Sequence, residues 1–454
     1  MPRVLERPAP LQLDTAFWML RQTNLAESAF DQVAHRSDSS IAPISSSAGG
    51  STRDALRSGV GGAESPGRGA AEDHLIFRLA RPCPAPITSH DLDRVRDWDR
   101  LLRVASEENA IIALRSCLKG ANGSTVPPGL ERYVAMIALD REFRMRQLQF
   151  RLERALEALN RAGIDVMLLK GGALASTVYG SFIKRPMRDL DILVRPEQAD
   201  DARALMLDLD WAVDPDLPGD RSYGTHHHLP PLRDVGASGL RLEIHRAILP
   251  AGHPFRFTDE ELWRAARRVT IGDAHAFVMH PVHHAIHVAI HFAWSHMLKM
   301  GGWHAFRDLG TLAAAEMFDW NEFVETALHW RASHCCYWTL RLAQTLADFE
   351  APPSVLERLG PSLPEIIRRP LARHFLNELV PADVACPPPR LDRALWSLAM
   401  QPRREGHALV RPWLVSLDLL FALNDSDGDS SEERASFFDR MARSARYISN
   451  IIGS

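Results

Sequence analysis

The chain has 454 residues, 46% hydrophobic and 24% charged, which is ordinary for a soluble globular protein and long enough for two or three domains. Lys and Arg total 53 against 57 Asp and Glu, so the net charge of -4 gives no bulk-charge argument for binding nucleic acid or an anionic membrane. No stretch reaches the roughly 20 apolar residues of a spanning helix, and the N-terminus lacks a signal-peptide pattern. We therefore expect a cytoplasmic protein with no membrane partner.

Residues 1–76 are predicted to form a largely disordered extension, because 37–72 is a Ser/Gly/Ala-rich linker with almost no aromatic residues. A helical region follows over 77–155, where apolar residues recur at spacings of three and four. Its last helix, within 139–163, ends where Gly163 stops the run. Five apolar side chains share one face of this helix: Met145, Leu148, Leu152, Ala155 and Leu159.

An α/β catalytic core is expected over 156–270. Its first strand, 164–169, leads through Gly171 and Gly172 into a short helix and a basic loop. The second strand, 189–194, is short and carries two aspartates among apolar residues.

The chain then enters a helix opened by Pro196, at the first-turn position where proline is tolerated. A hairpin is predicted next, because the strand patterns at 225–234 and 240–248 are separated by the turn-rich stretch VGASG. The remainder is predicted to be a helical bundle over 271–380 and a C-terminal helical extension over 381–454. The expected fold class is thus α/β (α+β), with a small mixed sheet between two helical regions.

The aspartates of the second strand raise a physical question, since burying an unpaired charge costs several kcal/mol. Alternation places Asp189 and Asp191 on one face of the strand, roughly 6.6 Å apart at about 3.3 Å per residue. In the later strand the same alternation places Glu243 on a polar face with Arg241 and His245. The three carboxylates could share one metal ion or two, and metal ions would offset their charge.

Cations and glycines near these acids suit a metal-bound triphosphate, because backbone N–H groups at glycines can approach phosphate oxygens. The basic residues are Lys170, Lys184, Arg185 and Arg188. Such a site favours phosphoryl or nucleotidyl transfer, with Glu243 or Asp191 as candidate base. An isolated DxD pair also arises from ordinary salt bridges, for example to the arginines of the basic loop. The adjacent glycines, the basic loop and the third acid favour the catalytic interpretation.

The stretches GIDVMLLKGGAL, VYGS…RPMRDLDILV and LEIH resemble the nucleotidyltransferase superfamily. They are more similar to a family of uncharacterised bacterial nucleotidyltransferases with an LKG…R…DxDhLV signature, from about residue 92 to about 360. The resemblance implies an NTP substrate and Mg²⁺ (or Mn²⁺) bound by Asp189, Asp191 and Glu243. It places Gly171 and Gly172 near the triphosphate.

Two features limit what this resemblance implies. Sixteen residues separate Gly172 from Asp189, a longer gap than is usual in the superfamily. The acceptor is also left open among a small molecule, a peptide, a protein and RNA. Relatives are often neighbours of biosynthetic genes for peptides or surface polysaccharides, so a role in natural-product or polysaccharide biosynthesis is one expectation.

Two alternatives stay open. Metal-dependent glycosyltransferases also use a DxD pair to hold a nucleotide sugar, although they usually build several parallel strands before it and here one precedes it. A non-catalytic nucleotide-binding protein is the other alternative.

Histidines form two further patterns. His280, His283, His284, His287 and His291 can share one helix face. We interpret this stripe as packing of a partly buried helix against the sheet; a metal-binding helix, or one or two imidazoles reaching the substrate cleft, are the alternatives. In the run HHH at 226–228, strand alternation would split the side chains between two faces, so that at most His226 and His228 act together.

Overall fold

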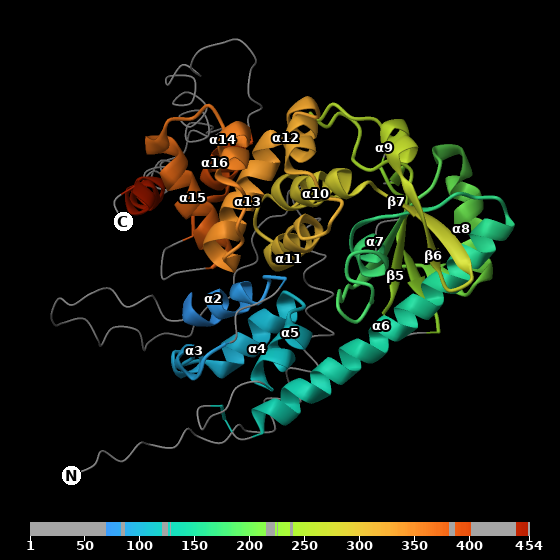
Figure 1. The fold of residues 1–454 in the computed structure, drawn as a ribbon, viewed down its shortest axis with the longest axis horizontal. Coiled ribbons are helices and arrows are strands. Elements are labelled where there is room, and N and C mark those ends of the chain that lie inside the picture. Colours follow the sequence, from blue (N-terminus) through green and yellow to red (C-terminus); the bar gives the residue numbers. More distant parts are fainter. Residues whose placement is uncertain are drawn as a thin grey trace, which may run out of the picture.

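The computed structural model describes residues 70–82, 87–119, 126–127, 129–214, 223–224, 226–236, 239–380, 386–400 and 442–452. Most of the extension expected at 1–76 and most of the expected C-terminal extension at 381–454 lie outside this part. Figure 1 shows a small group of N-terminal helices, a sheet with flanking helices, and a helical bundle that carries the chain towards its end.

The elements follow one another in three groups. The N-terminal helices are α2 (Ala70–Arg78), α3 (Ser89–Asp93), α4 (Trp98–Glu107), α5 (Ile111–Leu118) and α6 (Leu130–Arg161). The sheet region comprises β1 (Met167–Leu168), α7 (Lys170–Ser176), β2 (Asp189–Leu193), the 3-10 turn η1 (Pro196–Gln198), α8 (Ala199–Asp208), β3 (Trp211–Val213), β4 (Leu232–Asp234), β5 (Arg241–His245), α9 (Asp259–Ala265), β6 (Arg267–Ile271) and β7 (Ala274–Val278). The bundle comprises α10 (Pro281–Ile290), the π-helical turn η3 (His291–Ser295), α11 (Gly302–Ala313), α12 (Trp320–His329), α13 (Ser333–Ala347), α14 (Pro353–Leu359), α15 (Glu365–Leu379) and α16 (Pro389–Ala399), and residues 442–452 are also helical.

The strands form one mixed sheet in the order β3-β4-β5-β2-β1-β7-β6. The pairs β2/β5 and β1/β7 are parallel, and the other pairs are antiparallel. The predicted fold class is therefore confirmed. The β4/β5 pair corresponds to the predicted hairpin. The sheet extends to Val278, past the boundary expected at 270, because the β6/β7 hairpin returns the chain to lie beside β1.

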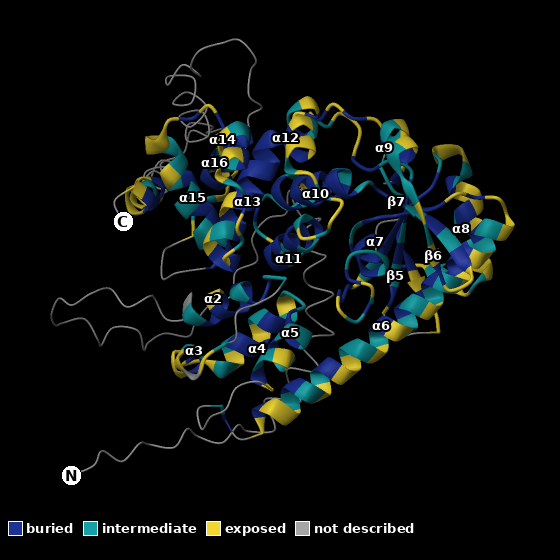
Figure 2. Cartoon of the chain, viewed as in Figure 1, coloured by how far each residue is buried: buried dark blue, intermediate teal, exposed yellow. Residues whose placement is uncertain are grey.

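The two faces of the sheet belong to different hydrophobic clusters. Leu190 and Ile192 pack in a cluster with residues of α6 and α8. Leu193, with Met167 and Leu169, belongs to a second cluster that includes the buried residues of α10 and the rest of the bundle. Figure 2 shows buried residues throughout the interior of the sheet and the bundle. The central strands are thus covered on both sides, as mixed and parallel strands usually are.

The long helix α6 joins the N-terminal helices to the sheet (Figure 1). All five side chains predicted to share its buried face are buried, and Gly163 just after its end adopts a left-handed conformation with φ of 72°. The helix begins at Leu130, earlier than expected. Its first turns contribute Val134 and Ala138 to the bundle cluster, and its later turns pack on the sheet.

Among the described residues, no helix is both long enough and apolar enough to cross a bilayer.

Candidate active site

The carboxylates predicted from the sequence come from two neighbouring parallel strands. Register pairs Asp191 of β2 with Glu243 of β5, and Asp189 with Arg241. Residues paired across adjacent strands project their side chains to the same face of the sheet. The structure therefore brings Asp189, Asp191 and Glu243 together.

Asp191 lies at the centre of the site and is 4% exposed. The Lys170 ammonium donates to Asp191 Oδ1 at 2.8 Å, and His245 Nε2 lies 3.0 Å from the same oxygen. His245 Nε2 also lies 3.5 Å from Glu243 Oε2. Within the chain itself, the negative charge of Asp191 inside β2 is thus compensated by the Lys170 ammonium and the His245 imidazole.

The pKa values of the two aspartates are shifted in opposite directions by their surroundings. Burial, reinforced by the carboxylates of Asp191 and Glu243, raises the pKa of Asp189 to about 6. Burial acts in the same direction on Asp191, but Lys170 and His245 outweigh it and hold the pKa of Asp191 well below its usual range. Burial would lower the pKa of Lys170, yet the surrounding carboxylates outweigh it and raise that pKa. The site therefore holds a charged lysine–aspartate pair beside a carboxyl group that keeps its proton more readily.

Lys170 is also unusual in its backbone, since its φ of 43° lies in the left-handed region. A residue other than glycine costs about 1–3 kcal/mol there and persists only when its surroundings hold it. The contact of its side chain with Asp191 provides such a constraint.

The donor set is compatible with a metal ion. Asp191, Glu243 and His245 can each offer one ligand atom, and these atoms lie within 4.8 Å of one another. Carboxylate oxygens suit Mg²⁺ or Mn²⁺, and the added imidazole nitrogen of His245 favours Mn²⁺ over Mg²⁺. Asp189 adds a further carboxylate on the same face of β2.

The glycines occupy the first turn of α7 beside the acids. Both are buried, and a Cβ added to Gly171 would lie 3.3 Å from the Met187 sulfur. Gly172 has more room, with Leu190 at 3.8 Å from such a Cβ. Close packing against Met187 of the loop is thus a sufficient reason for a glycine at position 171.

The basic loop 181–188 separates into exposed and buried members. Lys184 and Arg188 are exposed, and Arg188 Nη2 donates to the Glu107 carbonyl at 3.1 Å. Arg185 is buried, and its guanidinium donates two hydrogen bonds to the Asp308 carboxylate of α11, at 2.7 and 2.8 Å. Tyr179 donates to the same carboxylate at 2.8 Å. The Arg185 guanidinium therefore links the loop to the bundle, and we interpret Arg185 as a positioning residue.

The histidine stripe of α10 is largely buried and lies close enough to Lys170 to feel its charge. His284 and His287 are 2% and 4% exposed, as the packing interpretation requires. Burial first, and the nearby positive charge of Lys170 among other groups, hold the pKa values of His287 and His291 well below the usual range. These imidazoles are neutral groups near Lys170.

His245 is a site residue that sequence reasoning did not select. Its signal was its place on the polar face of β5, two residues after Glu243. The run at 226–228 also differs from expectation, because all three imidazoles gather, with ring centroids 4.2–4.8 Å apart. Residues 226 and 227 form a bend and only His228 pairs with β5, by a single bridge to His245, so strand alternation does not apply.

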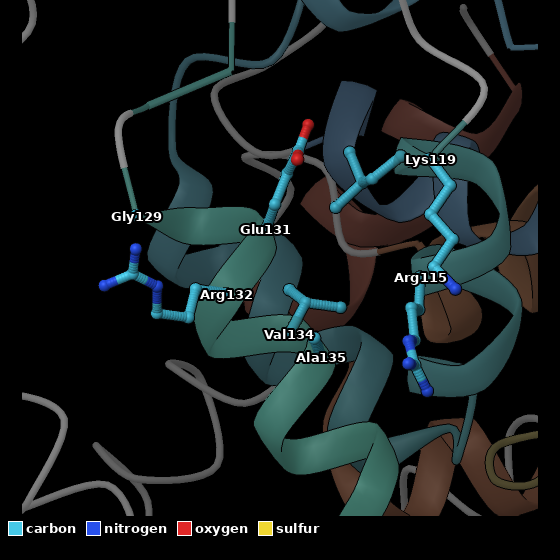
Figure 3. Close-up of a pocket in the computed structure, with 8 residues that line it drawn as sticks. Arg115, Lys119, Gly129, Glu131, Arg132, Val134 and Ala135 are labelled. Carbon is cyan, nitrogen blue, oxygen red and sulfur yellow. The ribbon is translucent and has the colours of Figure 1, made fainter.

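A pocket of about 420 Å³ lies elsewhere, between α5 and the start of α6 (Figure 3). Arg115, Lys119, Glu131 and Arg132 are among its lining residues, and none of the site acids is. It is therefore separate from the acidic site.

Fold and site together define an α/β protein with a metal-compatible acidic site on two central parallel strands. Residues 94–348, just over half of the chain, match the family described as uncharacterised nucleotidyltransferase, and the chain belongs to this family. The resemblance found from the sequence is thereby confirmed. The chain matches no curated protein and no solved structure.

Proposed function

We propose that this protein is a metal-dependent nucleotidyltransferase that moves an NMP group from an NTP to an acceptor. The observation that carries the proposal is the register of β2 and β5, which sets Glu243 directly opposite Asp191, with Asp189 two residues earlier on β2. Membership of the family supports nucleotidyl transfer in general. The acceptor is a small molecule, a peptide, a protein or RNA.

In this proposal Asp189, Asp191 and Glu243 hold the divalent metal, Mg²⁺ or Mn²⁺. When bound, the metal would neutralise developing charge on the triphosphate and lower the pKa of an attacking hydroxyl. Lys170 is the cation nearest to these carboxylates, with its Nζ 2.8 Å from Asp191. It would contribute charge at the phosphates once its contact with Asp191 is exchanged for the metal.

Two other groups expected to bind the nucleotide keep that role in the proposal. Arg188 is exposed and adjacent to Asp189, so it can reach a phosphate oxygen. Gly171 and Gly172 are proposed to lie near the triphosphate, where the lack of side chains permits close approach of the backbone. Arg185 acts indirectly, through the position of the loop.

The topology argues against the glycosyltransferase alternative. In the described part of the chain one strand, β1, precedes Asp189, and it is two residues long. Several parallel strands before the DxD pair were the feature expected of those enzymes. A non-catalytic nucleotide-binding protein is distinguished by experiment.

The test is transfer of label from each of the four α-³²P-labelled NTPs, with Mg²⁺ or Mn²⁺, into the protein, tRNA and a host lysate. We expect label from at least one NTP with the wild type, and a loss of at least about 100-fold with Asp189→Asn/Asp191→Asn, the scale for removing electrostatic stabilisation at a reacting centre.

The matched control is Asp200→Asn/Asp201→Asn, which removes two exposed carboxylates from α8. It should transfer label like the wild type. Metal-dependent NTP binding without transfer would indicate the non-catalytic alternative. Equal transfer by the wild type and the site variant would overturn the assignment of the acids.

A further inference from the structure

Three consecutive histidines converge beside the acidic site. One ligand nitrogen from each of His226, His227 and His228 lies within 4.8 Å of the other two. The ring centroids are 4.2 Å apart for His226 and His228, and 4.5 and 4.8 Å apart for the two pairs that include His227. Imidazole is the commonest protein ligand of transition metals.

Backbone contacts hold this histidine cluster, His226–His228, against the end of β5. The Arg246 and Ala247 N–H groups both donate to the His227 carbonyl, at 2.8 and 3.1 Å. The Arg246 guanidinium donates to the His226 carbonyl at 3.1 Å and to the Tyr223 carbonyl at 2.8 Å. The backbone that presents the rings is thus fixed before any ligand binds, which lowers the cost of ordering it.

Hydrogen bonding also selects the tautomer of one ring. His228 Nδ1 lies 2.7 Å from the Leu229 carbonyl, which can only accept, so Nδ1 carries the proton. The lone pair of this imidazole is then on Nε2. Metal-binding histidines are commonly oriented in the same way, by a carbonyl or carboxylate on the second nitrogen. His227 Nδ1, in turn, is buried with no hydrogen-bond partner among the described residues.

We propose that His226, His227 and His228 bind a divalent transition metal of the Zn²⁺ class, at a site distinct from the carboxylates. Zn–N bonds of about 2.0–2.1 Å in a tetrahedral site place ligand nitrogens about 3.3 Å apart. The three nitrogens already lie within 4.8 Å of one another, so each pair would have to approach by at most about 1.5 Å on binding. Mg²⁺ prefers oxygen and would not compete for three imidazoles.

The cluster adjoins the acidic site through one residue. The His227 and His228 rings lie 5.4 and 5.3 Å from the His245 ring, and His245 Nε2 contacts both Asp191 and Glu243. A metal bound by the histidine cluster would fix the ring against which His245 packs. It would therefore act as a positioning element for the carboxylates.

The test is metal binding by the full chain, expressed without a histidine tag and stripped with a chelator. Co²⁺ would be titrated and followed by its visible absorption, and Zn²⁺ affinity would be measured by competition with a chromophoric chelator. We expect one tight site with imidazole coordination in addition to any metal that the acidic site binds. His226→Gln/His228→Gln should weaken it by at least about 100-fold, since loss of even an outer-shell partner costs about 10–100-fold.

The matched control is His275→Gln/His329→Gln, two histidines outside the cluster, which should bind like the wild type. A measurement on the wild type alone guards against a variant that misfolds: Zn²⁺ should protect the 226–228 peptide from carbethoxylation, read by mass spectrometry. No NTP is present, so the result is independent of nucleotidyl transfer. Equal affinity in urea-unfolded and folded chain, or no protection, would overturn the proposal.

Discussion

Lys170 combines a left-handed backbone with a partly buried ion pair to Asp191. Its φ is 43° and its Nζ lies 2.8 Å from Asp191 Oδ1. Strained residues cluster at functional sites and persist only where the surrounding structure holds them. For Lys170, attraction to the carboxylate of Asp191 is what holds the residue in place. A bound metal ion would also compensate the negative charge of the acids.

Replacing Lys170 by Met should therefore destabilise the metal-free protein by up to about 3 kcal/mol, since the buried carboxylate of Asp191 would lose one of its two partners and keep only His245. Met has a similar length and lacks only the charge, so the difference reports the ion pair together with the constraint that it places on the backbone of residue 170. Mg²⁺ or Mn²⁺ should restore more stability to Lys170→Met than it adds to the wild type. Urea unfolding with and without metal measures both quantities.

Lys184→Met is the control for this experiment, because Lys184 is an exposed lysine of the adjacent loop. It should unfold like the wild type in either buffer. If Lys170→Met unfolded at the same urea concentration as the wild type, the pairing with Asp191 would not be what stabilises the acids.

At the scale of elements, the contact between α4 and α11 contains a carboxyl group with a shifted pKa. Glu108, directly after α4, accepts a hydrogen bond from the Trp303 N–H at 3.2 Å. Burial, more than the neighbouring charge of Glu107, raises the pKa of Glu108 to about 7. The contact is therefore sensitive to pH.

Between about pH 4.5 and pH 7, Glu108 binds more protons in the folded chain than in the unfolded chain. The free energy of unfolding therefore falls as the pH rises through this window. Glu108→Gln keeps the acceptor for Trp303 and removes the charge. We expect it to raise the free energy of unfolding by on the order of 1 kcal/mol at pH 8, a modest value because the side chain is only partly buried. At pH 4 the effect should be small, because the Glu108 carboxyl group is then protonated in the folded chain.

Thermal unfolding of the wild type and Glu108→Gln across this pH range measures the difference. Glu131→Gln, on the exposed first turn of α6, is the control and should show no such pH dependence. A constant difference between wild type and Glu108→Gln from pH 4 to pH 8 would contradict the assigned pKa.

The elements also show which parts of the site could be predicted from sequence. Period-two alternation assigned the faces of Asp189, Asp191 and Glu243, because each strand packs an apolar face on the core. The pairing of Glu243 with Asp191 was not predictable, since the register and order of strands depend on tertiary contacts. The gathering of the histidine cluster depends on a local bend that breaks the alternation.

Longer-range contacts were the least predictable. Arg185 is expected from the sequence to bind the nucleotide, and that expectation stays a prediction. Its contact with Asp308 could not be predicted, because Asp308 is far away in the sequence, on a helix whose placement over the loop the local pattern does not encode. The sheet also extends to Val278, beyond the end of 270 expected for the core, for a similar reason. Nothing in the pattern of β7 indicates that it inserts beside β1.

At the scale of the whole molecule, the sheet and the bundle share one interior. Met167, Leu169 and Leu193, with Leu174 of α7, belong to the cluster that includes α10 and the rest of the bundle. The opposite face packs on α6 and α8. The catalytic strands therefore depend on both helical groups, and the family match from 94 to 348 spans elements of all three parts.

We expect a fragment of residues 129–280, which holds α6 and all seven strands of the described sheet, not to fold alone. It would expose Met167, Leu169, Leu174 and Leu193, and burying each such side chain stabilises a protein by about 1.5–3 kcal/mol. Their sum, about 6–12 kcal/mol, is as large as the whole stability of a typical domain.

Circular dichroism, amide dispersion in NMR and urea unfolding of this fragment test the dependence, with residues 70–400 as the control that retains the bundle. The control should unfold in one cooperative transition, and the fragment should show none. A fragment with dispersed amides and a cooperative transition would mean that the sheet is an autonomous domain. The contacts of Arg185 and Tyr179 with Asp308 would then join two parts that fold independently.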